Sequence, residues 1–309
     1  MIDPQCFAPW VSEEAREAFK TESDAPPAPR GDIAALRAHY DAFNRRHLEA
    51  ALAHYPVAIE RSAVGSVTVD IISSQDGARD DRTLICLHGG AFMWGRGAGA
   101  LLEAVPVAAK LGVRVVAVEY ALAPEAVFPA AVNDVVAVFD ALCRELPPSR
   151  IGIYGCSAGG VLTAQTTARL LRDGKPLPGA IAMLCGTGLE MTGDSAMSAG
   201  PLNGEPASAA PNLAALPYFS GCEARDPLVF PGNHPDVLAD FPPSLLVTGT
   251  RDFAASSVAT MHRRLLAARA EAELLLFDGM GHAFHMATTL PEARETFAAM
   301  SRFFGRHLR

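Results

Sequence analysis

A chain of 309 residues, half of them hydrophobic (50%), is long enough to bury a large core in one domain or two. Its formal charge of −8 argues against a nucleic acid or an anionic membrane surface as partner. No run approaches the ~20 apolar residues of a membrane span, and the first residues lack the basic and apolar regions of a signal peptide, so we expect a cytoplasmic protein without membrane contact.

Residues 1–60 are predicted to be mainly helical. Ser12 can cap a short helix whose first turn carries Glu13 and Glu14. In a second helix, residues recur at intervals of three and four and form one helical face: Ile33, Leu36, Tyr40, Phe43 and His47. Because both helices precede the first predicted strand, we expect them to pack outside the fold that follows.

From about residue 65, strand-like runs alternate with helical patterns. The predicted strands are 67–72, 83–87, 113–118, 150–154, 180–184, 244–248 and 273–277. Apolar strands separated by helices predict an α/β protein with a mostly parallel sheet buried on both faces. Residues 186–222, rich in Gly, Ser, Ala, Pro and Met, interrupt this alternation and predict an insertion over the strand ends.

The pentapeptide Gly155-Cys156-Ser157-Ala158-Gly159 follows one predicted strand and precedes a helical run. This G-x-S-x-G pattern is typical of a nucleophile elbow, a strained strand-to-helix turn that exposes the serine hydroxyl. Ser157 would stand at the positive end of the following helix. Because the elbow presents its central residue, we interpret Cys156 as a neighbour that is not a nucleophile.

The sequence His88-Gly89-Gly90-Ala91-Phe92 follows the strand predicted at 83–87. It matches the His-Gly-Gly type of oxyanion loop. We predict that the N–H groups of Gly89, Gly90 and Ala158 hold the negative oxygen of a tetrahedral intermediate, where the loss of one donor typically costs ~10²–10³ in rate. The ring of His88 is predicted to brace this loop by hydrogen bonding.

A serine becomes a nucleophile when a base removes its proton, and the expected chain order is Ser, then an acid, then His. Asp252 follows the strand predicted at 244–248, and His282 lies in a glycine-flanked turn after the last strand. We predict that His282 takes the proton of Ser157 while Asp252 fixes the histidine tautomer. His285, three residues later, is the alternative base.

The six cysteines contain no Cys-x-x-Cys pair and no cysteine–histidine spacing typical of zinc. We therefore predict no metal site, and a disulfide framework is not expected in a large chain without a leader. Cys86 and Cys185 lie in apolar runs and are interpreted as small buried hydrophobic residues.

Taken together, these motifs resemble those of the bacterial hormone-sensitive-lipase-like (family IV) esterases of the α/β-hydrolase fold. The resemblance spans roughly residues 65–305 and rests on segments 88–92, 120–125, 128–131 with Asp134, 155–160, Asp252 and 282–284. It implies a carboxylic-ester hydrolase without metal or cofactor. It also implies a cap formed by residues 1–60 and 186–222 over a catalytic core of 61–185 and 223–309.

Three positions depart from the family pattern. Ala91 replaces the third glycine of the oxyanion loop, and Cys156 replaces the usual acid before the nucleophile. Ala121 replaces the usual arginine after Tyr120, so we predict that a structural ion pair with Glu125 is missing.

The leading hypothesis is hydrolysis of short- to medium-chain esters, because the small and flexible residues of the insertion suggest a modest pocket. Five residues are predicted to line it: Phe92, Trp94, Leu189, Tyr218 and Phe219. A lactone hydrolase with the same triad, an amidase, and a ligand-binding protein on the same scaffold remain alternatives. The only expected partner is a small-molecule ester, apart from a second copy of the chain, since dimers are common in such families.

Overall fold

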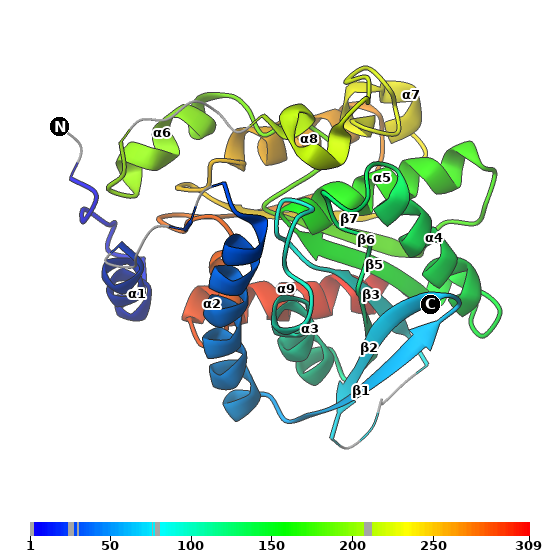
Figure 1. The fold of residues 1–309 in the computed structure, drawn as a ribbon, viewed down its shortest axis with the longest axis horizontal. Coiled ribbons are helices and arrows are strands. Elements are labelled where there is room, and N and C mark those ends of the chain that lie inside the picture. Colours follow the sequence, from blue (N-terminus) through cyan, green and yellow to red (C-terminus); the bar gives the residue numbers. More distant parts are fainter. Residues whose placement is uncertain (1–2, 24–27, 30, 76, 78–80, 207–211) are drawn as a thin grey trace.

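The protein is described here from a computed structural model, which covers residues 3–23, 28–29, 31–75, 77, 81–206 and 212–309 (Figure 1). Its centre is one eight-stranded sheet with the order β1-β2-β4-β3-β5-β6-β7-β8. The strands are β1 (Val57–Val64), β2 (Val67–Ser74), β3 (Thr83–Leu87), β4 (Arg114–Val118), β5 (Ile151–Cys156), β6 (Ala180–Leu184), β7 (Ser244–Gly249) and β8 (Ala272–Phe277). β1 and β2 are antiparallel to their neighbours, and all other pairs are parallel. The predicted mostly parallel sheet is confirmed.

Helices cover both faces of this sheet, which is why its central strands are largely apolar: every residue of β3, β5, β6 and β7 is buried. On one face pack α4 (Ala130–Leu142), α5 (Ala158–Arg172) and α8 (Ala255–Ala267). On the other face pack α3 (Ala98–Leu111) and α9 (Pro291–His307) (Figure 1).

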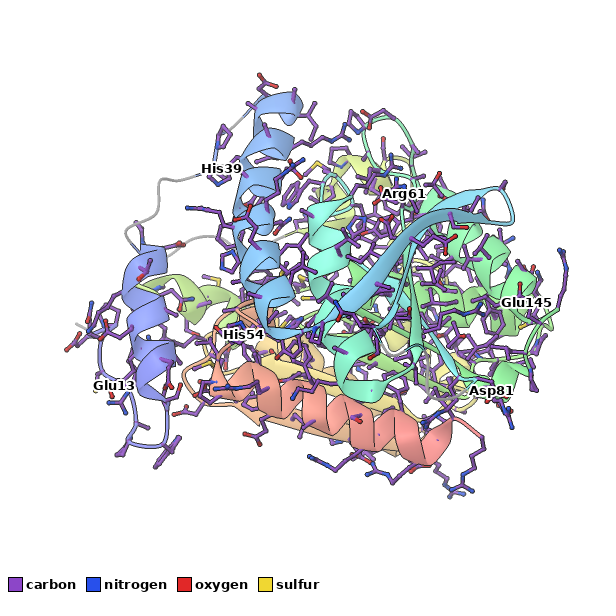
Figure 2. The ribbon with its side chains drawn as sticks, turned by 90° about the horizontal axis from the view of Figure 1, so that it is seen from below. Glu13, His39, His54, Arg61, Asp81 and Glu145 are labelled. Atoms are coloured by element: carbon purple, nitrogen blue, oxygen red, sulfur yellow. The ribbon has the colours of Figure 1, made fainter. Side chains whose placement is uncertain are left out.

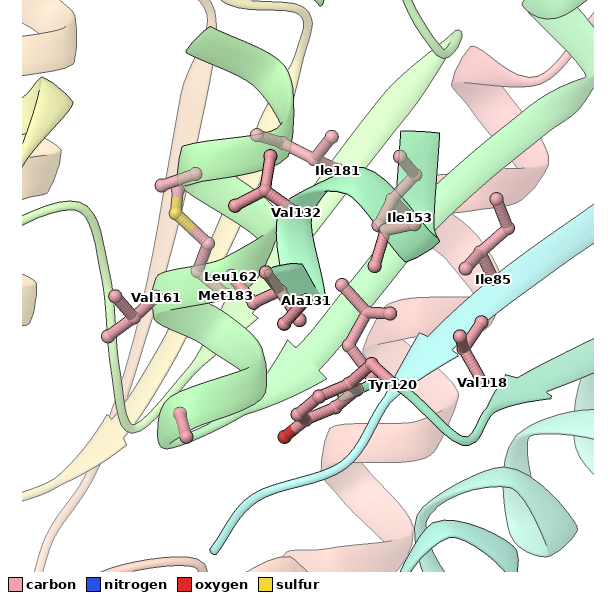
Figure 3. Packing of buried hydrophobic residues seen from close by; sticks show 14 of the residues in the cluster. Ile85, Val118, Tyr120, Ala131, Val132, Ile153, Val161, Leu162, Ile181 and Met183 are labelled. Carbon is pink, nitrogen blue, oxygen red and sulfur yellow. The ribbon is translucent and has the colours of Figure 1, made fainter. Parts of the chain in front are cut away.

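Figure 3 shows the first of these two cores from close by. Val132 of α4 and Leu162 of α5 pack there against Ile153 and Ile181 of the sheet. The second core, on the α3 and α9 face, contains aromatic side chains such as Phe297 and Phe304. The two cores hold the sheet rigidly, so its strand ends can position reactive side chains.

The two N-terminal helices lie outside the sheet, as predicted (Figures 1 and 2). In α1 (Glu13–Ser23), the predicted cap is confirmed, because the backbone N–H of Ala15 donates to the Ser12 hydroxyl at 3.1 Å. Ser12 also donates to Glu292 of α9 at 2.8 Å, which ties this helix to the core. The second helix, α2 (Ile33–His54), begins after Asp32, whose carboxylate caps it.

The structure differs from the sequence prediction at β1, which begins inside the segment predicted to be helical. All of its residues are at least partly exposed, so it lacks the apolar run that predicts a buried strand. Its edge position is stabilised by Arg61, which lies 2.7 Å from Asp70 of β2 (Figure 2 labels Arg61). A charged, exposed strand is typical of a sheet edge.

Residues 186–222 contain α6 (Asp194–Leu202) and the short 3₁₀ helices Leu213–Ala215 and Pro217–Phe219. α6 is attached to α8 by hydrogen bonds between Ser195 and Ser256 at 2.8 and 3.0 Å. Among the described residues, no helix has both the length and the apolar character needed to cross a membrane.

The buried guanidinium of Arg251 connects the chain's first residues to α6. It donates to the carbonyl oxygens of Pro4, Cys6 and Leu202 at 2.6 to 3.0 Å, and it stacks over the ring of Phe7 at 3.8 Å. Arg251 directly precedes Asp252, so the N-terminal segment and the insertion meet beside a predicted catalytic residue.

Candidate active site

The turn from β5 to α5 has the backbone geometry of a nucleophile elbow. Ser157 has φ 53° and ψ −117°, a strained conformation for a residue with a side chain. A Cβ atom on Gly155 or Gly159 would overlap the carbonyl oxygen of Leu87 at the end of β3. The two glycines therefore allow β5 and α5 to approach β3 closely, and this approach holds the serine at the strand ends.

The structure brings Ser157, His282 and Asp252 together. His282 Nε2 lies 2.9 Å from Ser157 Oγ, and His282 Nδ1 lies 2.7 Å from Asp252 Oδ1. The Asp252 carboxylate is fully buried and also accepts hydrogen bonds from the Ala254 N–H at 2.8 Å and the Thr248 hydroxyl at 2.7 Å. Burial acts to raise the pKa of Asp252, but the attraction to His282 and these hydrogen bonds outweigh it and leave the pKa lowered.

His285, the alternative base, lies in the 3₁₀ helix Phe284–Met286 and is buried. Its Nδ1 atom has no hydrogen-bond partner among the described residues. Burial lowers the pKa of His285 to about 4, assisted by the nearby positive character of His282. His282, whose ring stacks on Phe253 at 4.1 Å, is therefore the histidine that the fold aims at Ser157.

The N–H group of Gly89 already donates a hydrogen bond within the protein. It donates to Glu103 Oε1 of α3 at 2.7 Å, so the structure is at odds with the predicted role of Gly89 as an oxyanion donor. The N–H groups of Gly90 and Ala91 have no acceptor among the described residues. Ala91 takes φ 50°, the left-handed conformation that the family's glycine would adopt more easily.

His88 braces the oxyanion loop in the way the sequence suggests. Its Nδ1 lies 2.7 Å from the carbonyl oxygen of Gly89, and its ring stacks on Tyr120 at 4.2 Å. The hydroxyl of Tyr120 donates to the His88 carbonyl oxygen at 2.6 Å. Burial lowers the pKa of His88 to about 4, so the ring is neutral and serves as a fixed donor to Gly89.

Glu103 was missed by the sequence reasoning. It is 4% exposed, and burial raises its pKa to about 8, against the opposing effect of backbone hydrogen bonds from Gly89 and Cys156. One signal could have found it: Glu103 is the single charged residue in the apolar stretch 98–108. A buried acid in such a stretch needs a specific partner.

The prediction that Glu125 lacks an ion-pair partner is wrong. Arg37 of α2 supplies the guanidinium, with two bonds of 2.7 Å to the two carboxylate oxygens. Arg37 also donates to the carbonyl oxygens of Met93 at 2.8 Å and Ala123 at 2.9 Å. The hydrogen bonds from Arg37 lower the pKa of Glu125 to about 2. The partner lies 88 residues away in the chain, which is why no local motif revealed it.

Cys156 is buried, and so are Cys86 and Cys185, as predicted. Hydrogen bonding to Cys185 and burial raise the pKa of the Cys156 thiol well above its ordinary value. A protonated, inaccessible thiol is a poor nucleophile, which supports the interpretation of Cys156 as a passive neighbour.

Within the described part of the chain, two overlapping groups of side chains could offer ligand atoms to a metal ion. They are Cys156, Cys185 and His285, and Cys185, Asp252 and His282; in each group the atoms lie within 4.8 Å of one another. Hydrogen bonding to Cys185 and burial raise the pKa of Cys156, and the pKa of Cys185 is raised despite an opposing hydrogen bond with Cys156, because burial and nearby Asp252 raise it. A metal would therefore have to displace thiol protons there. The second group shares two residues with the triad, whose hydrogen bonds already occupy them.

A cavity of about 470 Å³ lies beside His282. It is formed by α1, α2, the end of α6 and the loop that carries His282, and its lining includes Phe19, Tyr40, Phe43, Asn203, Glu205 and Phe284. A second cavity of about 520 Å³ lies between α2 and the loops at 94–96 and 121–126. It contains no triad residue, so the cavity beside His282 is the candidate substrate site.

None of the five residues predicted to line the substrate pocket is among those lining the cavity beside His282. Phe92 stacks on Tyr218 at 4.3 Å and packs edge-on against Phe219 at 5.3 Å, all three being buried. Leu189 is buried as well. Trp94 lines the second cavity and stacks on Tyr40 at 4.5 Å, which in turn lines the first. Core packing accounts for Phe92, Tyr218 and Phe219 without substrate.

Comparison with known proteins agrees with this geometry. Residues 84–286, more than half of the chain, match the model of a family described as the alpha/beta hydrolase fold. An acetyl-hydrolase of Streptomyces hygroscopicus is 29% identical over 230 residues, which cover 73% of this chain and 76% of the relative. The putative acetyl-hydrolase LipR of Mycobacterium tuberculosis is 28% identical over 258 residues, which cover 81% of this chain and 80% of the relative.

Two solved structures are similar over nearly the whole chain. Esterase E25 has a TM-score of 0.85 and 26% identity, covering 100% of this chain and 98% of that protein. An esterase from the bacterial hormone-sensitive lipase family has a TM-score of 0.83 and 27% identity, covering 96% and 99%. The chain therefore belongs to the alpha/beta hydrolase family and is an esterase of the hormone-sensitive-lipase-like type.

Proposed function

We propose that this esterase hydrolyses short- to medium-chain carboxylic esters through an acyl-enzyme formed on Ser157. The observation that carries the proposal is the hydrogen-bonded chain from Asp252 through His282 to Ser157, with links of 2.7 and 2.9 Å. Of these three residues, His282 lines the cavity. This is the arrangement of a serine hydrolase triad, which is recognised by geometry rather than by position in the chain.

In the acylation step, Ser157 Oγ attacks the ester carbonyl carbon while His282 Nε2 accepts the hydroxyl proton. Asp252 holds His282 Nδ1–H and stabilises the imidazolium that forms. The N–H groups of Gly90, Ala91 and Ala158 donate to the developing oxyanion. His282 then gives its proton to the departing alcohol, and the acyl group remains on Ser157.

In the deacylation step, a water molecule takes the place of the alcohol. His282 accepts a proton from this water as its oxygen attacks the acyl carbon, and the same N–H groups stabilise the second tetrahedral intermediate. Collapse of that intermediate expels Ser157 Oγ, which recovers its proton from His282. The products are a carboxylic acid and the free enzyme, and no cofactor takes part in either step.

The size of the site supports the proposed preference for short and medium chains. A volume of about 470 Å³ lies in the range of small-molecule pockets, and acyl and alcohol groups must share it. Aromatic side chains from α1 and α2, including Phe19 and Phe43, close one side. We propose that residues 1–60 and 186–222 form the cap over this cavity. Relatives named acetyl-hydrolase support a small acyl group.

The experiment is a rate series with p-nitrophenyl esters from acetyl to palmitoyl, with lactones added because a lactone would pass through the same acyl-enzyme. An organophosphate trap, followed by peptide mapping, locates the nucleophile. We expect the highest kcat/KM at acyl chains of roughly two to eight carbons and the adduct on Ser157. A preference for palmitoyl esters would overturn the proposed chain-length preference. Lactone turnover above that of every linear ester would favour a lactonase.

A further inference from the structure

Glu103 is an acidic side chain in an otherwise apolar part of α3. Its neighbours along the helix, Leu102, Ala104 and Val105, are buried and apolar, and Glu103 itself is 4% exposed. Burying a carboxyl group costs free energy unless its oxygens find hydrogen-bond partners. The hydrogen-bond partners of the Glu103 carboxyl group therefore indicate what this side chain does.

The main partner is the oxyanion loop. Glu103 Oε1 accepts a hydrogen bond of 2.7 Å from the Gly89 N–H, one residue before Gly90. The Gly89 position is also tightly bounded: an added Cβ would lie 3.2 Å from the Cys156 carbonyl oxygen and 3.4 Å from Ser157 Cβ. The carboxyl group therefore lies where the oxyanion loop and the nucleophile elbow meet.

The position of Glu103 is itself fixed by the sheet. Its backbone carbonyl oxygen accepts a hydrogen bond of 3.1 Å from the Tyr154 hydroxyl of β5. Backbone hydrogen bonding from Cys156, the residue before the nucleophile, also reaches the Glu103 carboxyl group. Cys156 carries a thiol where the sequence resemblance leads one to expect an acid, and the acidic side chain observed at this junction is Glu103 of α3.

We propose that Glu103 is a positioning residue of the oxyanion loop, holding Gly89 by its N–H so that the next two N–H groups point at the reacting carbonyl. The inference rests on the proposed function, in which this loop stabilises the tetrahedral intermediate. Glu103 touches neither the substrate nor the triad. It acts by holding Gly89, and the backbone of Cys156 ties the same carboxyl group to the elbow.

The charge of Glu103 gives this role a pH dependence. Burial raises its pKa to about 8, so the carboxyl group is mostly neutral at pH 7 and ionises above pH 8. The titratable groups that face it are the Cys86 and Cys156 thiols and the Tyr120 and Tyr154 phenols. Burial contributes to raising the pKa of each, so they stay neutral in this range.

A neutral acid can hold Gly89 without opposing the negative charge of the intermediate. An ionised carboxylate would hold it more tightly but would place a second negative charge beside the oxyanion, which raises the barrier. We therefore expect kcat for a short ester to decline as the pH rises through about 8. The amide in Glu103→Gln keeps an acceptor oxygen and cannot ionise, whereas Glu103→Leu removes the acceptor.

The experiment measures kcat and KM for p-nitrophenyl acetate from pH 6 to 9.5, corrected for spontaneous hydrolysis, in the full-length protein. We expect Glu103→Leu to lose about 10- to 100-fold in kcat with little change in KM, as for a small misplacement of catalytic groups. Glu103→Gln should keep kcat within about threefold at pH 7 and lose the alkaline decline.

The matched control is Gln165→Leu, which removes a buried side chain that donates to the Val229 carbonyl oxygen at 3.0 Å, away from the oxyanion loop. It should lower Tm and leave kcat and the pH profile unchanged. Wild-type kcat in Glu103→Leu, or an unchanged alkaline decline in Glu103→Gln, would overturn the proposal. If Glu103→Leu fails to fold, the pH profile of Glu103→Gln decides alone. An active Ser157→Ala would instead overturn the proposed function itself.

Discussion

The nucleophile elbow and the oxyanion loop follow two paired parallel strands, β5 and β3, and both meet at Ser157. They are nevertheless held in different ways. The elbow is held by close backbone approach, because Gly155 and Gly159 let β5 and α5 pack against the Leu87 carbonyl. The oxyanion loop is held largely by side chains that come from elsewhere.

Two of those side chains come from helices elsewhere in the chain. Glu103 of α3 binds the loop at Gly89, and Arg37 of α2 binds the carbonyl oxygen of Met93, the residue directly after the loop. These residues lie 14 and 56 positions from their partners. Local steric fit thus shapes one half of the site, and long-range hydrogen bonding shapes the other. The two halves should respond differently to substitution.

The largest effect is expected on the elbow side, at its central residue. Ser157→Ala removes the nucleophile and should lower kcat by ~10⁴-fold or more, because the residual rate comes from the oxyanion donors and binding alone. Steady-state rates with p-nitrophenyl acetate test this, and the circular dichroism spectrum should be unchanged. Substantial residual activity would place the nucleophile at another residue.

A single methyl group should also break the elbow. In Gly159→Ala the added Cβ would overlap the Leu87 carbonyl oxygen, so we expect a loss of about 3 kcal/mol in the free energy of unfolding and a large loss of activity. Urea denaturation measures the loss in the free energy of unfolding. Gly305→Ala in α9 is the matched control, since the nearest atom to its added Cβ is 3.8 Å away and alanine favours a helix. Equal stabilities for the two variants would contradict the steric account.

On the loop side, Arg37→Leu should lower kcat by about 10-fold, because the Met93 and Ala123 carbonyl oxygens lose their donor and the loop loosens. Arg37→Lys should recover little of this loss, since an ammonium group cannot reproduce the planar set of bonds. Arg45→Leu, on the same helix but pairing with Asp41 at the surface, serves as the control and should have wild-type kcat. Comparable losses at both positions would point to a general effect on α2.

The ion pair between Arg37 and Glu125 should stabilise the protein only above a defined pH. The pairing lowers the pKa of Glu125 to about 2, so its stabilising contribution is complete above the ordinary carboxyl pKa and disappears as the pH falls through 2. The difference in Tm between the wild type and Arg37→Leu should therefore be constant from pH 5 to 7 and shrink toward pH 2. A difference that grows at acid pH would show that another group is responsible.

The smallest effect is expected at the residue beside the nucleophile. Cys156→Ala should keep kcat within about threefold, because the buried, protonated thiol takes no part in the reaction. Labelling with iodoacetamide under native conditions should leave Cys156 unmodified, while the exposed Cys6 reacts. A loss comparable with that of Ser157→Ala would overturn the interpretation of Cys156.

Much of the fold could be predicted because its signals are local. Apolar runs of strand length identified seven of the eight strands, and the exposed, charged β1 was missed because an edge strand needs no apolar run. The grouping of Ser157, Asp252 and His282 was predictable for a related reason. Each follows a recognisable strand, and the carboxyl ends of parallel strands meet at one edge of the sheet.

The substrate pocket was less predictable. Phe92, Tyr218 and Phe219 are large and apolar near the expected site, but such residues pack into cores as readily as they line pockets. The lining of the cavity comes instead from α1, α2 and the end of α6, elements whose position depends on tertiary packing. Arg251, which ties the N-terminal segment to α6, carried no signal in the sequence either.

The sequence by itself was enough to predict the parallel sheet, the strand-to-helix turn at Ser157 and the chain order of the proposed triad, because these depend on short-range sterics and on apolar periodicity. The tertiary structure decided which N–H groups remain free for an oxyanion, since Gly89 is occupied by Glu103 and Gly90 is not. It also decided that Glu125 has a partner in Arg37. These outcomes depend on hydrogen bonds between residues that are 14 and 88 positions apart in the chain, and a local pattern does not show which two residues pair.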